Sequence, residues 1–249
     1  MSIQNKMKEI ILGREESFAG SPQVWSFCKA SDIVNNINLR LGNMAGGFPF
    51  KFKGHTWQDS ERLYLCGKFS DHTDQHQMIQ QALFTAPSSR AARSFVEVRF
   101  RDLVRPDFKS FRLQWMLYVV WQKCQNNESF RQLLLNVPQD AIIVEDRTTD
   151  SGESAGFWGC RNLELHNARV NLETILINRH KGLTHTEKSM LVSLETNKIN
   201  TVGQWKGQNN MGKILMICRD CLAQATEPEI DYELLGETGI HILDKMLFF

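Results

Sequence analysis

A carboxylate and an amine stand on the same side of a predicted helix in the first third of the chain. Asp59 is a favourable N-cap residue, and the pattern after it predicts a helix over about residues 60–69. Because an α-helix has about 3.6 residues per turn, Glu61, Tyr64 and Lys68 share one face of this helix, which is otherwise mostly apolar. Glu61 and Lys68 lie about 10 Å apart along the helix axis, and helical geometry makes Lys68 lean toward Glu61.

This pair of charges admits two interpretations. Charged groups on an apolar face are costly unless they are paired or reach water, so the first interpretation is an ion pair or side chains that extend to solvent. The second is the floor of a pocket, in which the carboxylate of Glu61 and the amine of Lys68 both face one substrate. The spacing alone leaves both open.

The stretch around this pair resembles the signature of the NADAR or YbiA-like family of N-glycosidases. The matching positions are Gly54, Trp57, Ser60, Glu61, Lys68 and Phe69. Residues 62–67 read Arg-Leu-Tyr-Leu-Cys-Gly where the family has His-Tyr-Phe-Gln-Ala-Gln, so both family glutamines are missing.

Two segments near the signature extend the resemblance. Asn43 and Phe50 match a family motif that reads Leu-Ser-Asn-Phe ahead of an aromatic strand, although Asn43 would also serve as an ordinary turn residue. Arg90 and Arg93 lie on a predicted helix. The corresponding segment of the family contains small residues followed by an arginine. The resemblance implies that these guanidinium groups meet phosphates, and the alternative is exposure to solvent.

An acidic loop continues the family order. A β-branched strand predicted over residues 141–144 leads into Glu145, and the loop that follows ends at Trp158 and Gly159. Either Asp150 or Glu153 fills the acidic place of the family in this loop. A tryptophan after a polar loop is a stacking platform for a base or sugar, and the alternative is that its indole packs in the core. For the acidic residues of the loop, the alternative to binding a ligand is simple exposure to solvent.

The last matching motif opens a helix near residue 210. It is matched by Gly207, Asn209, Gly212, Leu215, Met216 and Arg219. A helix N-terminus after a glycine-containing turn presents free N–H groups to an anion such as a phosphate, and Asn209 would assist. The alternative is a plain capped helix.

The resemblance implies a hydrolase that cleaves an N-glycosidic bond between a ribose and a base or amine, without a cofactor or metal. The favoured reaction removes ADP-ribose from ADP-ribosylated guanine in DNA or nucleosides, so the expected partner is an ADP-ribose conjugate or a phosphorylated nucleoside-like small molecule, with ADP-ribosylated DNA as a further candidate. The alternatives are hydrolysis of phosphorylated riboflavin-pathway intermediates and a non-catalytic ADP-ribose or nucleotide-binding module. The implied catalytic residues are Glu61 and Lys68, and the implied substrate contacts are Asn43, Trp57, Tyr64, Arg90, Glu145, Asp150, Trp158, Gly159 and Asn209.

Composition is that of an ordinary soluble globular protein. The 249 residues carry 29 Lys and Arg against 28 Asp and Glu, so the overall charge demands neither nucleic acid nor membrane as a partner. The six cysteines form no paired framework, and reduced thiols in a cytoplasm are the simplest account. His72 and His76 have the i, i+4 spacing of a metal site without an obvious third ligand, so a solvated helix face is expected.

The expected fold is a single, mainly helical α+β domain with a few short strands. Residues 24–27 and 48–52 alternate like strands. A central helix is predicted over residues 106–124, and its run 113–121 is apolar nearly all round, which marks a buried helix. The expected organisation is an N-terminal extension over 1–40, a YbiA-like domain over 41–225 with an insertion at about 163–203, and a C-terminal extension over 226–249. The apolar end of this last extension must dock on its own domain or on another chain.

Overall fold

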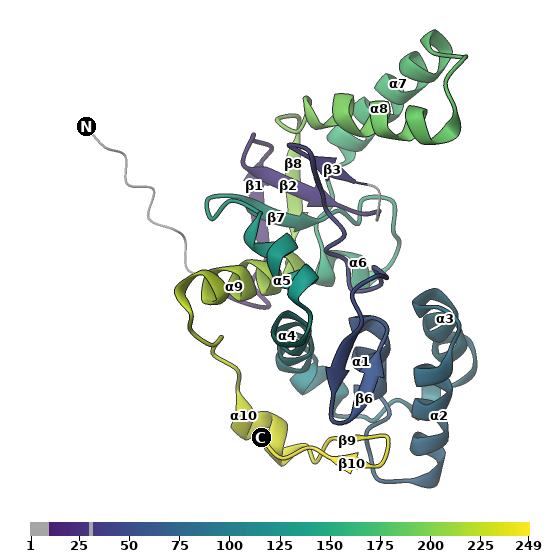
Figure 1. Ribbon diagram of the computed structural model, residues 1–249, viewed down its shortest axis with the longest axis vertical. Coiled ribbons are helices and arrows are strands. Elements are labelled where there is room, and N and C mark those ends of the chain that lie inside the picture. The colour runs from purple at the N-terminus through teal and green to yellow at the C-terminus, as the bar shows by residue number, and fades with distance from the viewer. Residues whose placement is uncertain (1–9, 30–31) are drawn as a thin grey trace. The chain divides into compact units, whose positions relative to one another are not determined.

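The computed structural model (Figure 1) describes residues 10–29 and 32–249, so residues 1–9 of the expected N-terminal extension lie outside the described residues. In the described part, helices dominate and the strands pair only two by two, in the orders β1–β8, β2–β7, β3–β4, β5–β6 and β9–β10. This arrangement confirms the predicted mainly helical α+β class. None of the helices in the described ranges has the length and apolar composition needed to cross a bilayer.

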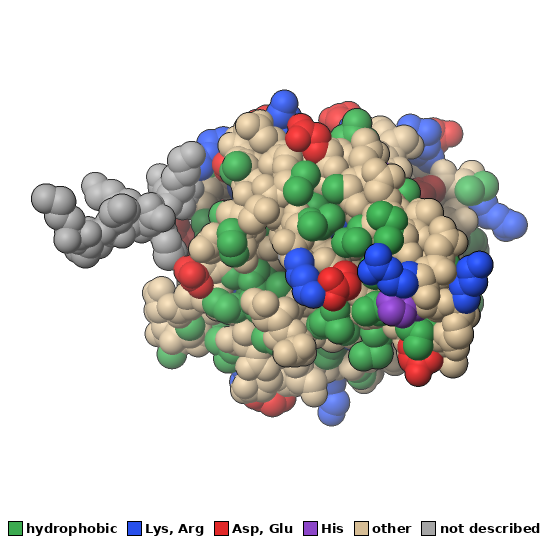
Figure 2. All heavy atoms as spheres, turned by 90° about the horizontal axis from the view of Figure 1, so that it is seen from above, with side chains coloured by type: hydrophobic (Ala, Val, Ile, Leu, Met, Phe, Trp, Pro, Cys, Tyr) green, Lys and Arg blue, Asp and Glu red, His purple; other side chains and the backbone are tan. Residues whose placement is uncertain are grey.

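The chain divides into two compact units. Among the described residues, the first contains 10–26 together with Ala141–Ile217, and the second contains 27–29 and 32–140 together with Cys218–Phe249. On the face shown in Figure 2, acidic and basic side chains are interspersed, as the nearly balanced charge of the sequence leads one to expect.

The first unit is built on short strands. Its elements are β1 (Glu16–Ala19), β2 (Val24–Phe27), β7 (Ile142–Glu145), α6 (Glu153–Trp158), α7 (Leu163–Arg179), α8 (His185–Asn197), β8 (Gln204–Gly207) and α9 (Asn210–Gln224), of which β2 and α9 also contain residues of the second unit. The antiparallel pairing of β1 with β8 sets Phe18 opposite Trp205, and Trp205 packs with Val24 and Val144 in the core. The strand predicted over residues 24–27 is therefore confirmed.

The segment expected as an insertion forms two helices. α7 and α8 lie side by side (Figure 1, green), and α8 begins with a capping box in which Thr184 and Glu187 exchange hydrogen bonds. In the sequence, helical patterns stand out only around residues 172–175 and 190–194, and both helices run well beyond these fragments. Apolar side chains of α7 such as Leu163 and Val170 are exposed, so no regular buried stripe marks the full length of this helix in the sequence.

The second unit surrounds a buried helix. Its elements are β3 (Ile33–Val34), β4 (Ile37–Asn38), β5 (Phe50–Phe52), β6 (His55–Trp57), α1 (Ser60–Gly67), α2 (Asp74–Thr85), α3 (Ser89–Arg99), η1 (Arg101–Leu103), α4 (Phe108–Asn126), α5 (Glu128–Leu135), α10 (Tyr232–Glu237), β9 (His241–Ile242) and β10 (Lys245–Met246). Along α4, every residue from Trp115 to Trp121 is buried, which confirms the predicted central helix. A two-residue turn with positive φ at Lys53 and Gly54 joins β5 to β6.

One expectation for α2 was wrong, and one apolar residue lies away from its buried stripe. Met78 has a helical spacing in the sequence with Ala82, but it is 74% exposed, because the buried stripe of α2 runs through Ile79 and Leu83. His76 was expected on a solvated face but is buried, and its Nε2 lies 2.9 Å from the Leu103 carbonyl oxygen. The ring of His76 therefore ties α2 to η1.

The apolar C-terminal end docks on its own unit. Leu247 is buried, and the ring of Phe249 lies 5.1 Å from the ring of Tyr118 and 6.3 Å from that of Tyr232. Of the two docking partners that the sequence left open, the chain itself supplies the surface.

Candidate active site

The helix that carries the charged pair is buried along its whole length. The side chain of Asp59 caps α1 by accepting a hydrogen bond from the Arg62 amide at 3.0 Å, as the sequence predicted. The helix ends at Gly67, earlier than the predicted residue 69, and Lys68 follows as its C-cap with helical dihedral angles. Lys68 thus stands at the very end of the helix that carries Glu61.

Gly67 explains one departure from the family signature. A Cβ atom at this position would lie 2.2 Å from the indole nitrogen of Trp115, and that nitrogen donates a hydrogen bond to the Tyr64 carbonyl at 3.1 Å. The indole therefore fills the space that a side chain at position 67 would need.

Asn43 holds Glu61 in place through two groups. The amide nitrogen of its side chain donates to the Glu61 carboxylate at 3.0 Å, and its backbone carbonyl accepts from the Glu61 amide at 3.2 Å. The same carbonyl accepts from the Ser60 hydroxyl at 3.2 Å, so the loop of Asn43 also closes the first turn of α1. Both Asn43 and Glu61 are buried. Because a hydrogen bond to a carboxylate is worth about 1.5–3 kcal/mol, Glu61 has a fixed orientation.

The amine of Lys68 is partly buried beside an aromatic ring. Its Nζ lies 6.0 Å from the centre of the Phe108 ring. Burial lowers the pKa of Lys68, Glu61 and Glu97 oppose that shift, and Arg93 and Arg112 reinforce it. A lowered pKa increases the fraction of neutral amine, which is the nucleophilic form.

Two arginines belong to the surroundings of Lys68. Arg93 on α3 is half-buried and bonds Glu97 at 2.8 Å, whereas Arg90, one turn earlier, is exposed. Arg112 on α4 also acts on the amine of Lys68, although the sequence analysis treated this helix only as core. Its spacing of four residues from Phe108 puts both on one face of α4, and that spacing is the signal that could have identified Arg112.

Tyr64 and Trp57 pack inside the unit. Burial raises the pKa of Tyr64, so its hydroxyl remains protonated at neutral pH, and its ring lies 5.5 Å from the Phe108 ring. Trp57 is completely buried and packs on Phe84 with ring centres 5.0 Å apart. The structure therefore gives Trp57 a core contact and no exposed surface for a ligand.

The remaining predicted residues gather in the first unit, around the end of β7. The side chain of Asn209 donates to the Ile143 carbonyl at 2.8 Å and accepts from the Glu145 amide at 3.2 Å, so both ends of its amide bind backbone. Gly159 lies so close to this strand that a Cβ atom there would be 2.2 Å from the Glu145 carbonyl oxygen. Glu145, Gly159 and Asn209 thus come together through the backbone of one strand end.

The acidic loop and its tryptophan complete this group. Asp150 pairs with the guanidinium of Arg147, which also lies 3.5 Å from the Glu145 carboxylate. Trp158 ends α6, is half-buried and makes an edge contact with Phe157. Asp150 and Glu153, the two candidates for the acidic place of the family, are both exposed.

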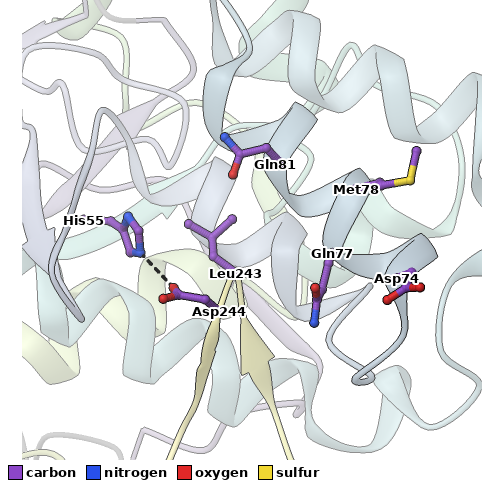
Figure 3. Close-up of a pocket in the computed structure, with 7 residues that line it drawn as sticks. All are labelled: His55, Asp74, Gln77, Met78, Gln81, Leu243 and Asp244. Atoms are coloured by element: carbon purple, nitrogen blue, oxygen red, sulfur yellow. Dashed lines mark hydrogen bonds and ion pairs between the residues drawn. The ribbon is translucent and has the colours of Figure 1, made fainter.

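A pocket of about 520 Å³ lies elsewhere in the second unit (Figure 3). It is lined by His55, Asp74, Gln77, Met78, Gln81, Leu243 and Asp244, so none of the predicted site residues contributes to it. Among the described residues, no group of three or more histidine, cysteine, aspartate or glutamate side chains is arranged to hold a metal ion.

Comparison with known proteins identifies the family. The family model of the NADAR domain matches residues 25–223. The chain belongs to the NADAR family. This match includes parts of both units and the whole of α1, which confirms the resemblance drawn from the signature.

A solved structure shares the NADAR fold seen here. The NMR structure of the E. coli protein YbiA is 22% identical in sequence, with a TM-score of 0.50, and the alignment covers 81% of this chain and 86% of YbiA. At this identity the likeness establishes the fold alone. A search of curated proteins gives no match.

Proposed function

We propose that this NADAR protein is an N-glycosidase that removes ADP-ribose from ADP-ribosylated guanine. The observation that carries the proposal is the end-to-end arrangement on α1, where Asn43 fixes the carboxylate of Glu61 and burial lowers the pKa of Lys68. An ion pair that served only stability would not need a separate residue to orient the carboxylate. The arrangement supplies instead an acid and base group on α1 and a nucleophilic amine at the C-cap of the same helix.

The two residues divide the reaction between them. Glu61 acts as the proton donor to the ribose ring oxygen as the bond from this oxygen to C1 breaks, which leaves an iminium between C1 and the nitrogen of the base. The neutral amine of Lys68 then adds to C1, and the bond from C1 to the base nitrogen breaks after this nitrogen receives a proton. Water hydrolyses the resulting Schiff base, which releases the ribose aldehyde and restores the amine.

The cationic surroundings of Lys68 support a phosphorylated substrate. Arg93 and Arg112 both act on the Lys68 amine, and arginine binds phosphate oxygens with paired N–H groups. A diphosphate near these arginines would leave the ribose that it carries close to Lys68. ADP-ribose has both groups in one molecule, which is why we favour it over a substrate without phosphates.

The test is a mass-spectrometric assay with ADP-ribosylated guanosine, both free and within a DNA oligonucleotide. Wild-type protein should release free ADP-ribose, and Lys68→Ala and Glu61→Gln should lose turnover. Lys51→Ala is the matched control, because Lys51 is an exposed lysine of β5 in the same unit. Binding of ADP-ribose with no release from either substrate would contradict the proposed enzymatic activity and favour a non-catalytic ADP-ribose-binding module.

A further inference from the structure

The backbone at the end of α1 is held by an unusually complete set of hydrogen bonds. Every carbonyl of residues 67–70 has a donor from outside the regular helical pattern. These are Ser70 Oγ for Gly67 (2.8 Å), the Arg105 amide for Lys68 (2.9 Å), Gln80 Nε2 for Phe69 (2.7 Å) and the His241 amide for Ser70 (2.9 Å). Helix ends usually leave such carbonyls to water, so the position of Lys68 is defined by these partners.

Gln80 connects this helix end to the C-terminal segment. It is buried on α2, and its amide nitrogen reaches the carbonyls of Phe69 and His241, each at 2.7 Å. Its amide oxygen accepts a hydrogen bond from the Leu243 amide. One side chain therefore binds the end of α1, strand β9 at His241 and the first residue of the turn that follows this strand, Leu243.

Arg105 makes a second connection of the same kind. Its guanidinium is buried and donates to the Ser70 hydroxyl at 2.8 Å and to the Thr238 carbonyl at 2.7 Å. Two further bonds of 2.7 Å to the Asp107 carboxylate fix the plane of the guanidinium. The backbone amide of Arg105 also holds the Lys68 carbonyl.

The tip of the C-terminal hairpin is fastened more weakly. Leu243 has positive φ, and the carboxylate of Asp244 lies 3.3 Å from His55 Nε2, as the dashed line in Figure 3 shows. The side chain of Asp244 is 67% exposed and that of His55 is 31% exposed, so this pair adds little to docking. The buried bonds of Gln80 and Arg105 thus carry the attachment.

From this network we propose that the C-terminal segment 228–249 acts as a clasp that positions Lys68, with Gln80 and Arg105 as its positioning residues. The segment lies beyond the matched range of the NADAR domain, which ends at residue 223. The inference rests on the proposed function in one respect, namely that Lys68 is the reacting amine. Release of the clasp would free the Ser70 carbonyl from the His241 amide and remove the carbonyls of His241 and Thr238 that Gln80 and Arg105 bind. The end of α1 would then loosen, and the amine of Lys68 would gain access to water.

The test uses the full chain with Gln80→Leu and Arg105→Met, which disconnect the clasp at two different points. Asp244→Asn is the matched control, because it alters only the exposed contact at the hairpin tip. The readout is the pH dependence of Lys68 acylation, followed by peptide mass spectrometry, which requires no substrate. Both variants should raise the apparent pKa of Lys68 by about one pH unit and lower kcat about tenfold with little change in KM, while the control leaves each unchanged.

An unchanged acylation profile in folded Gln80→Leu and Arg105→Met proteins would overturn the clasp. Native-state hydrogen exchange of the wild type tests the same inference if either variant fails to fold. The amides of His241 and Leu243 should open together with those of Lys68 and Phe69, whereas independent opening of the hairpin would contradict the proposal. A shifted acylation profile in a protein without glycosidase activity would keep the clasp and refute the proposed function.

Discussion

Replacement of Lys123 by methionine should stabilise the protein at neutral pH. Lys123 is a lysine of α4 with 1% exposure, and no other group among the described residues accepts a hydrogen bond from its Nζ. The ammonium lies 3.9 Å from the centre of the Phe130 ring and 5.3 Å from that of Phe48. These aromatic faces offset only part of the cost of burying a charge.

The magnitude follows from the pKa. Burial lowers the pKa of Lys123 from 10.5 to about 8. Since one pH unit corresponds to about 1.4 kcal/mol, the charged form costs about 3 kcal/mol in the folded state at pH 7. Between pH 8 and 10.5 the unfolded chain binds more protons at this lysine than the folded chain, so wild-type stability rises with pH across that window. Methionine has a similar volume and does not titrate.

Urea denaturation of wild type and Lys123→Met at pH 7 and pH 10 provides the assay. The stability advantage of the variant should shrink by about 2.5 kcal/mol between the two pH values. Lys51→Met, at an exposed position of β5, is the control and should show no such change. An advantage of Lys123→Met that is the same at both pH values would refute the reasoning.

Two further predictions concern other contacts in the second unit. Gly67→Ala should destabilise the fold by about 2 kcal/mol in urea denaturation, because the new Cβ would meet the Trp115 indole at 2.2 Å. Gly236→Ala is the control and should be neutral or slightly stabilising, because the space around Gly236 is open. Equal effects of the two substitutions would contradict this packing. Burial and the neighbouring His72 ring, 4.4 Å away, lower the pKa of His241 from 6.5, so stability present above pH 6.5 should be lost as the pH falls. Between pH 7.5 and pH 5.5, the free energy of unfolding should fall less for His72→Gln than for wild type. An equal fall in both proteins would show that His72 does not lower the pKa of His241.

Helices and strands that are specified by their own residues could be predicted from the sequence. The Asp59 cap, the strand at residues 24–27 and the central helix at residues 106–124 follow from capping, alternation and continuous apolar sequence, and the structure contains all three. Helix α7 was only partly anticipated, since its exposed apolar side chains do not form a regular buried stripe. Met78 illustrates the same limit, because an apolar residue next to a buried stripe need not belong to it.

Long-range contacts in the candidate site could not be predicted from the residues alone. The hydrogen bond from Asn43 to Glu61 joins residues 18 positions apart, and only the family resemblance singled out Asn43. Gln80 is an ordinary polar residue in the sequence, yet it binds backbone as far away as His241. Arg112 was concealed by its place just before the continuous buried run of α4, which begins at Trp115.

The most direct test of the central claim is borohydride trapping on ADP-ribosylated guanosine, followed by peptide mass spectrometry. The account predicts a stable ADP-ribose adduct on Lys68 in the wild type, and no adduct in Lys68→Ala together with no release of ADP-ribose. Release of ADP-ribose by Lys68→Ala at the wild-type rate would contradict this account, because the reaction would then proceed without the amine of Lys68.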